Sequence, residues 1–179
     1  MCVERLVTEA FDKEYVEELD VEYVGYANQT IKTPCVGLCS TVYGDLVCRG
    51  CKRFSHEVID WNAYTELEKA IVDERLANFL SLCVQNKFVV IDPGLLRWQL
   101  QTQQIRFNPA HDQYCGLFAL LKAGASQIKE PETFGFSIHL SWRKCNLTEL
   151  RELVDQEFWS LSDAHHQRYL ATPDLFTSE

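Results

Sequence analysis

The chain has 179 residues, of which 46% are hydrophobic and 24% are charged, a composition typical of folded globular proteins rather than disordered or membrane-spanning ones. Its net charge of −9 disfavours nucleic acid as a partner, because phosphate backbones bind chiefly to Lys and Arg. Residues 1–30 contain eight acidic and two basic residues and form an acidic N-terminal segment, whereas the remainder is close to neutral.

The first residues lack the basic stretch and apolar run of a secretory leader, and no run of about eighteen apolar residues occurs. We therefore expect a cytoplasmic protein without membrane contact. Because the cytoplasm keeps thiols reduced, clustered cysteines there indicate a metal or redox site rather than structural disulfides.

In the first half of the chain, apolar residues spaced three and four apart predict an amphipathic helix over residues 3–18. Residues 31–53 are rich in Gly, Cys and turn formers, which indicates an irregular loop braced by a ligand. Ser55 is the expected cap of a short helix that carries Trp61.

A longer helix follows, because Thr65 and Glu68 form a capping box in which each side chain bonds the other residue's amide. Its apolar stripe extends to Cys83.

The second half combines helices with short strands. A β-branched run predicts a strand over 87–91, and Asp92 followed by Pro93 predicts a helix that extends to about Gln104. The elements expected after it are a helix from Tyr114 to Gly124, a strand over 134–142, a helix capped by Asn146 and Glu149, and a last helical stretch over about 163–170.

The predicted fold class is therefore α+β, mainly α. It has three regions, which are the acidic segment 1–30, a four-cysteine module with its helix over 31–84, and a mainly helical region with two short strands over 85–179.

Four cysteines occur close together in the loop, at Cys35, Cys39, Cys48 and Cys51. Gly37 and Gly50 lie inside the two pairs and allow the backbone to curl so that both sulfurs of a pair face one point. Gly44 offers the reversal that brings the two pairs together. The spacing predicts four thiolates around one metal site, with either a single zinc ion or an iron–sulfur cluster as the cofactor.

Further residues at set distances from these cysteines complete a longer pattern, namely Pro34, Arg53, Glu57, Trp61, Glu68 and Arg75. Over about residues 33–76 the pattern resembles a family of short bacterial proteins of unknown function that are commonly described as predicted iron–sulfur proteins. Residues 87–170 are similar to the C-terminal extension of longer, proteobacterial members. The resemblance implies an iron–sulfur cluster on the four cysteines and supplies no reaction.

Three functions stay open at this stage. The leading one is a cytoplasmic iron–sulfur protein that acts in electron transfer, in redox sensing or as an accessory to another enzyme. The second is a structural zinc module that mediates protein–protein interaction. The third is an enzyme with a substrate pocket in the C-terminal half, around His111, His139 or His165, although no catalytic motif is present. We expect a protein partner.

The cations beside the cysteines, Arg49, Lys52 and Arg53, have two interpretations. They offset the negative charge of the thiolates, or they form a docking patch for an acidic partner. Trp61 is expected to pack as a lid over the cysteine site.

Other sulfur and imidazole groups lie outside the loop. His111 and Cys115 are four residues apart and would ligate a second metal if they shared a helical face, together with His139 or Cys145. The neighbouring His165 and His166 are expected to be exposed.

Overall fold

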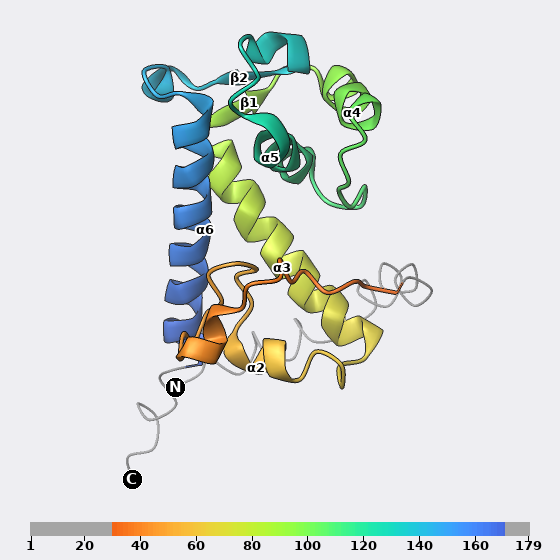
Figure 1. The fold of residues 1–179 in the computed structure, drawn as a ribbon, viewed down its shortest axis with the longest axis vertical. Helices are drawn as coiled ribbons and strands as arrows, with labels where there is room; N and C mark the ends of the chain where they lie inside the picture. Colours follow the sequence, from red (N-terminus) through yellow and green to blue (C-terminus); the bar gives the residue numbers. More distant parts are fainter. Residues whose placement is uncertain (1–29, 171–179) are drawn as a thin grey trace, which may run out of the picture.

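A computed structural model describes residues 30–170 of the chain (Figure 1). The helix predicted over 3–18 and the acidic segment up to residue 29 lie outside the described residues. The main elements are α2 Ser55–Ile59, α3 Glu66–Gln85, β1 Phe88–Val90, α4 Pro93–Thr102, α5 Gln113–Gly124, β2 Phe136–Ile138 and α6 Leu147–Tyr169, with short 3-10 helices at Ser40–Tyr43, Pro131–Phe134 and Leu140–Trp142.

The mainly helical α+β class is confirmed, and so are several predicted helix starts. Thr65 accepts a hydrogen bond from the Glu68 amide at 3.3 Å, and the Glu68 carboxylate accepts one from the Thr65 amide at 2.7 Å. Asp92 caps α4 by accepting from the Leu95 amide at 2.9 Å. These caps satisfy amides that would otherwise lack a partner at each helix start.

The sheet is smaller than predicted. β1 and β2 pair antiparallel, with Phe88 opposite Ile138 and Val90 opposite Phe136. The strand expected over 134–142 is limited to the three residues Phe136–Ile138, because 3-10 turns form on both sides of it.

Two helix boundaries differ from the predictions. α2 has Phe54 rather than Ser55 at its cap position, and Glu57 accepts from the Phe54 amide at 2.8 Å. The stretch over 163–170 is not a separate helix, because α6 continues unbroken to Tyr169.

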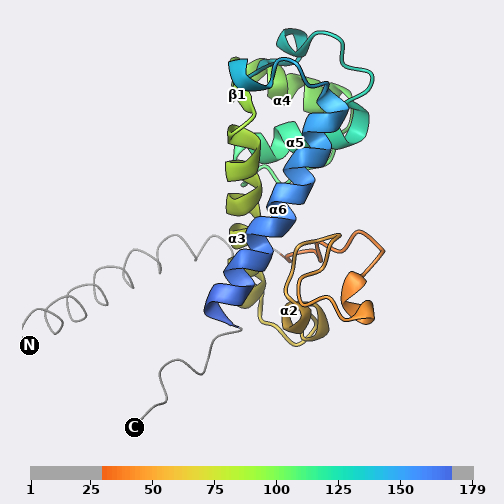
Figure 2. The same ribbon diagram turned by 90° about the vertical axis from the view of Figure 1, so that its left-hand side faces the viewer.

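The core lies where α3, α5 and α6 pack together. α3 and α6 are the two longest helices and lie side by side in both views (Figures 1 and 2). Buried apolar side chains from all three helices form one cluster, which includes Val72, Leu76, Leu117, Leu121, Leu150 and Val154. The helix of the predicted cysteine module thus shares its core with the predicted C-terminal region.

The cysteine loop and α2 lie at one end of α3 and α6, and the sheet and α4 lie at the other end (Figures 1 and 2). Between residues 30 and 170, the structure has no helix with both the length and the apolar character needed to cross a bilayer.

Candidate metal site

The second cysteine pair lies in a tight turn of the backbone. The Cys48 amide donates to the Arg53 carbonyl, and the Lys52 amide donates to the Cys48 carbonyl, both at 2.8 Å. Lys52 has a φ of 62°, the left-handed conformation that a residue other than glycine rarely adopts. An antiparallel β-bridge between Val47 and Phe54 joins the two ends of the turn. The turn therefore holds the Cys48 and Cys51 side chains on a fixed backbone frame.

The glycines of the cysteine loop are needed for different reasons, some for their backbone conformation and one for a close contact. Gly37 has a φ of 96°, as predicted for the first cysteine pair, and Gly44 has the same value where the chain reverses. Gly50 was expected to bend the second pair in this way, but Lys52 has the positive φ instead. A Cβ on Gly50 would lie 2.6 Å from Val36 Cγ2 and 3.0 Å from the Leu38 carbonyl oxygen. Gly50 is therefore needed for the close approach of the first pair's segment to the second.

The sulfur positions show how far the four cysteines are gathered. Cys39 Sγ lies 3.9 Å from Cys48 Sγ. Cys35 is exposed, and its sulfur accepts a hydrogen bond from the Gly37 amide at 3.4 Å. The loop cysteines are free thiols. Within residues 30–170, no three His, Cys, Asp or Glu side chains are grouped tightly enough to hold a metal ion. The structure thus brings one sulfur of each pair together, and neither Cys35 nor Cys51 completes a metal-binding group of three with them.

The 3.9 Å spacing suits two ligands of one ion. Sulfurs bound tetrahedrally at about 2.3 Å from a metal lie about 3.8 Å apart. The donor set also suits a soft metal, because it consists of thiols with no competing disulfide. Cys39 and Cys48 therefore fit two positions of a thiolate-bound metal site. A complete site would also need Cys35 and Cys51, and the metal would supply either a structural cross-link or a redox centre.

The environment of Cys48 favours its thiolate form. Burial raises the pKa of this thiol, but hydrogen bonds from the backbone of Cys51, Ser40 and Gly50 outweigh burial and lower the pKa to about 7. For Cys51, burial is the dominant effect and raises the pKa, although the Arg53 guanidinium donates to Cys51 Sγ at 3.3 Å and opposes it.

The three cations beside the cysteines are all engaged within the chain. Lys52 forms an ion pair with Asp155, and Arg49 forms one with Asp45 at 3.1 Å. Lys52 and Arg53 are each 2% exposed, so the docking-patch interpretation is wrong for both. Charge compensation beside thiols is the interpretation that their positions support.

Two residues of the longer motif, Glu57 and Arg75, form a network with Phe54. Glu57 is buried, and it accepts from the Phe54 amide and from Arg75 Nη2 at 2.7 Å. The Arg75 guanidinium lies 3.7 Å from the centre of the Phe54 ring. These contacts fix α2 on α3 directly behind the cysteine turn.

Trp61 contacts the cation beside the site. The Arg53 guanidinium lies 4.6 Å from the centre of the Trp61 ring and bonds to Cys51 Sγ. The predicted lid therefore reaches the cysteine loop through Arg53.

Two residues of α6 that the sequence did not single out hold the module. Trp159 Nε1 donates to the Val47 carbonyl at 3.2 Å, and the Arg49 guanidinium lies 4.4 Å from the centre of the Trp159 ring. Asp155 binds Lys52 from the same helix. Local spacing contained no signal for these contacts, since more than a hundred residues separate the partners.

The second metal site proposed around His111 and Cys115 is not formed. His111 precedes α5, so the two residues do not share a helical face. His111 Nε2 lies 2.8 Å from Asp73 Oδ2, and Cys115 Sγ donates to the Ala77 carbonyl at 3.4 Å. Burial raises the pKa of the Cys115 thiol to about 12, which disfavours metal binding through its thiolate.

The remaining histidines are dispersed. His139 is exposed at the start of a 3-10 helix, whereas Cys145 is half-buried. The expected exposure of His165 and His166 is wrong, because His166 is buried and His165 is half-buried, with its ring stacked on Phe54.

These features define a mainly helical protein with a cysteine turn seated on two long helices. Residues 33–79, which include the four cysteines, α2 and most of α3, match the model of a family described as "Protein of unknown function (DUF1289)". This segment is similar to the family with which the cysteine pattern was compared. No curated protein and no solved structure matches the chain.

Proposed function

We propose that this chain is a metal–thiolate protein in which Cys35, Cys39, Cys48 and Cys51 hold one metal centre. The observation that supports it most is the 3.9 Å separation of Cys39 Sγ and Cys48 Sγ, sulfurs that come from the two different pairs. This contact brings one thiol of each pair to the spacing of two ligands of one metal ion.

The hydrogen bonds to Cys48 give independent support. Metal ligands must be thiolates, so a site whose backbone amides already stabilise the thiolate releases fewer protons when metal binds. The pKa of Cys48, lowered to about 7, has this effect near neutral pH. The Arg53 side chain adds a further N–H donor at Cys51 Sγ.

Two candidate centres follow, with different roles. Zinc would act as a structural cross-link between the two cysteine segments, and the spacing of the two sulfurs favours it. An iron–sulfur cluster would make the protein an electron carrier or a redox sensor. The resemblance to predicted iron–sulfur proteins favours the cluster, and so does the exposure of Cys35, which would place the centre close to the surface.

We expect the chain to bind a protein partner whether the centre is zinc or an iron–sulfur cluster. Several large apolar side chains within the first cysteine pair and between the two pairs are exposed, namely Val36, Leu38, Val42, Tyr43 and Leu46. Leu38 is 85% exposed and Tyr43 is 90% exposed. Exposed apolar side chains gathered in one short segment support a protein-binding role for the loop.

The test is metal analysis of the full chain. The protein is purified without a tag under anaerobic conditions, and one sample is used for an absorbance spectrum and for iron, sulfide and zinc determination. Cys48→Ser is the informative variant. Cys83→Ser is the matched control, because Cys83 is a buried thiol of α3 outside the cysteine loop.

Iron with matching sulfide and visible absorbance, lost in Cys48→Ser and kept in Cys83→Ser, would establish the cluster. Zinc at about one ion per chain with no visible band, lost in the same variant, would establish the structural site. A protein without bound metal that also fails to take up zinc or to accept a reconstituted cluster would refute the proposal.

A further inference from the structure

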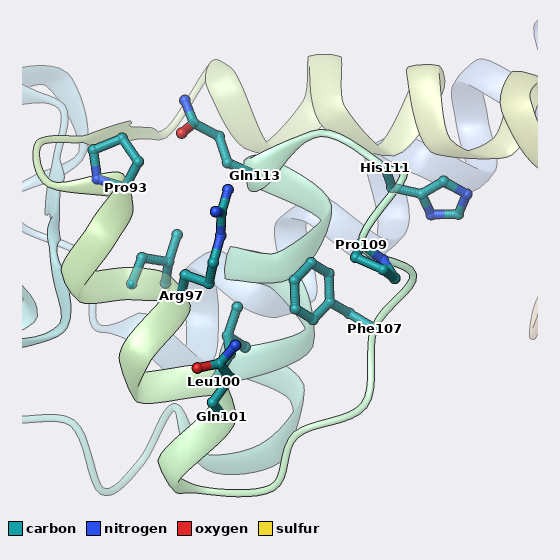
Figure 3. A pocket seen from close by; sticks show the side chains of 9 residues that line it. Pro93, Arg97, Leu100, Gln101, Phe107, Pro109, His111 and Gln113 are labelled. Atoms are coloured by element: carbon teal, nitrogen blue, oxygen red, sulfur yellow. The ribbon is translucent and has the colours of Figure 1, made fainter.

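A second site lies in the C-terminal region, away from the cysteine loop. A pocket of about 310 Å³ opens between α4 and the segment that leads into α5 (Figure 3). Its volume is at the lower end of the range for small-molecule sites and is too small for a folded partner.

The inner wall of this pocket is apolar and tightly packed. Leu96 and Leu100 of α4 are each 2% exposed, and Phe107 and Pro109 line the opposite side. A Cβ on Gly116 would lie 3.0 Å from Leu100 Cδ1 and 3.4 Å from the Phe107 ring, so α5 already packs closely behind the wall. The inner wall of the pocket therefore consists of side chains that are packed against α5.

One cation lines the pocket. The Arg97 side chain runs along the opening from α4 and ends between Pro93 and Gln113 (Figure 3). No described residue forms an ion pair or a hydrogen bond with the Arg97 guanidinium, and no acidic side chain is among the described residues that line the pocket. Within residues 30–170, none of the guanidinium N–H donors is used by another residue.

The neighbouring titratable groups, His111, Asp92 and Asp112, are already engaged. His111 belongs to the lining, but its ring points away from Phe107 (Figure 3), and its Nε2 lies 2.8 Å from Asp73. Asp92 and Asp112 cap α4 and α5, respectively. Arg97 is therefore the group that selects the charge of a ligand here.

We propose that this pocket binds a small molecule that joins an apolar body to a single carboxylate. The apolar wall would cover the body, and the guanidinium would bind both carboxylate oxygens in its fork geometry. A ligand with several phosphates fits less well, because no second cation is among the described lining residues and the chain carries a net charge of −9.

The test uses two probes that differ only in charge, 3-phenylpropionate and its neutral analogue 3-phenylpropionamide. Each is titrated into the ¹⁵N-labelled full chain, and the amide shifts of α4 and of residues 105–113 are followed. We expect saturable shifts with the carboxylate and about tenfold weaker binding of the amide, since a charge-assisted hydrogen bond is lost.

Arg97→Gln should bind both probes with equal, weak affinity, whereas Arg106→Gln, which changes an exposed arginine outside the lining, should bind like the wild type. Equal binding of the two probes to the wild type, unchanged affinity in Arg97→Gln, or an absence of shifts in the pocket would overturn the proposal. Because the pocket is separate from the cysteines, Cys48→Ser should bind the carboxylate normally, so this test does not depend on the metal.

Discussion

Lys87, at the start of β1, is a fully buried lysine. Its Nζ pairs with the half-exposed carboxylate of Glu157 on α6 and lies 5.1 Å from the centre of the Trp142 ring. A buried ammonium group is tolerated only when an opposite charge compensates for its lost hydration. The pair therefore connects the sheet to α6.

We expect Glu157→Gln to destabilise the fold by about 1–3 kcal/mol, because it leaves the Lys87 charge buried without its partner. Lys87→Met should cost less, since it removes the charge and keeps an apolar stem of similar length. Arg151→Gln, which breaks a more exposed pair with Glu152, should change stability by less than about 0.5 kcal/mol. Urea unfolding measures all three, and a larger loss in Lys87→Met than in Glu157→Gln would contradict this account.

The cysteines differ in thiol pKa, and this difference can be tested by labelling with iodoacetamide in metal-free protein. The Cys48 rate should rise about fivefold from about pH 6 to pH 7 and level off above about pH 8, because its pKa is about 7. Burial raises the pKa of Cys83 to about 11, so its rate should still be rising at about pH 10. Restricted access to a thiol slows its labelling at every pH but does not change the pH at which the rate is half-maximal. Mass spectrometry of the separate peptides gives the labelling rate of each cysteine. Equal midpoints for the two thiols would contradict the prediction.

The lowered pKa of Cys48 makes the stability of the fold depend on pH in a definite direction. Its folded pKa is lowered below the unfolded value of 9.0, so its contribution is complete above about pH 9 and is lost as the pH falls through about 7. Cys83 has the opposite sign, because its raised pKa stabilises the fold below about pH 9 and that contribution is lost as the pH rises through about 11.

At the scale of elements, the junction between β2 and α4 depends on one glycine. Gly135 has a φ of 81°, and its carbonyl accepts from the amides of Ile91 and Asp92. A Cβ at this position would lie 2.4 Å from the Asp92 carbonyl oxygen and 2.9 Å from the Leu96 amide nitrogen. The two segments meet this closely only because the side chain is absent.

Gly135→Ala should therefore destabilise the protein by about 2 kcal/mol or more, since both the backbone conformation and the contact oppose a Cβ. Gly124→Ala is the matched control. Gly124 is helical, and a Cβ there would meet no atom within 4 Å, so this variant should be neutral or up to about 1 kcal/mol more stable. Thermal unfolding compares them, and equal effects would show that the Gly135 contact is relieved by backbone movement.

Across the whole molecule, α3 and α6 connect two ends that differ in chemistry. The cysteine loop lies at one end, and the sheet and α4 lie toward the other (Figure 1). Arg97, which lines the pocket, belongs to α4. Trp159 and Asp155 hold the loop on α6, while Glu57 and Arg75 hold α2 on α3. The cysteine loop and α2 are thus held by these polar contacts together with the packing of Trp61 in the main core.

Trp159→Ala should loosen the module without unfolding the body, because it removes the hydrogen bond to Val47 and the surface under Arg49. Amide exchange at residues 46–54 should become about tenfold faster or more, while exchange in β1 and β2 stays unchanged. Trp98→Ala, which removes an exposed side chain of α4, is the control and should leave residues 46–54 unaffected. Faster exchange at both ends of the molecule would show that the module and the core open together.

The sequence by itself determined the starts of α3, α4 and α6. Thr65 with Glu68, and Asp92 with Pro93, were found because a cap and the amide it satisfies lie within a few residues of each other. The turn at Gly44 was found for the same reason.

Only the tertiary structure decided which distant groups meet. The strand over 134–142 was predicted too long, because its length depends on pairing with β1 nearly fifty residues earlier. The contacts of Trp159 with the cysteine loop, of Asp73 with His111 and of Arg97 with its pocket have no local pattern either. Backbone caps are local hydrogen bonds and leave a mark in short spacings, whereas burial and side-chain pairing arise when the helices pack and depend on the whole chain at once.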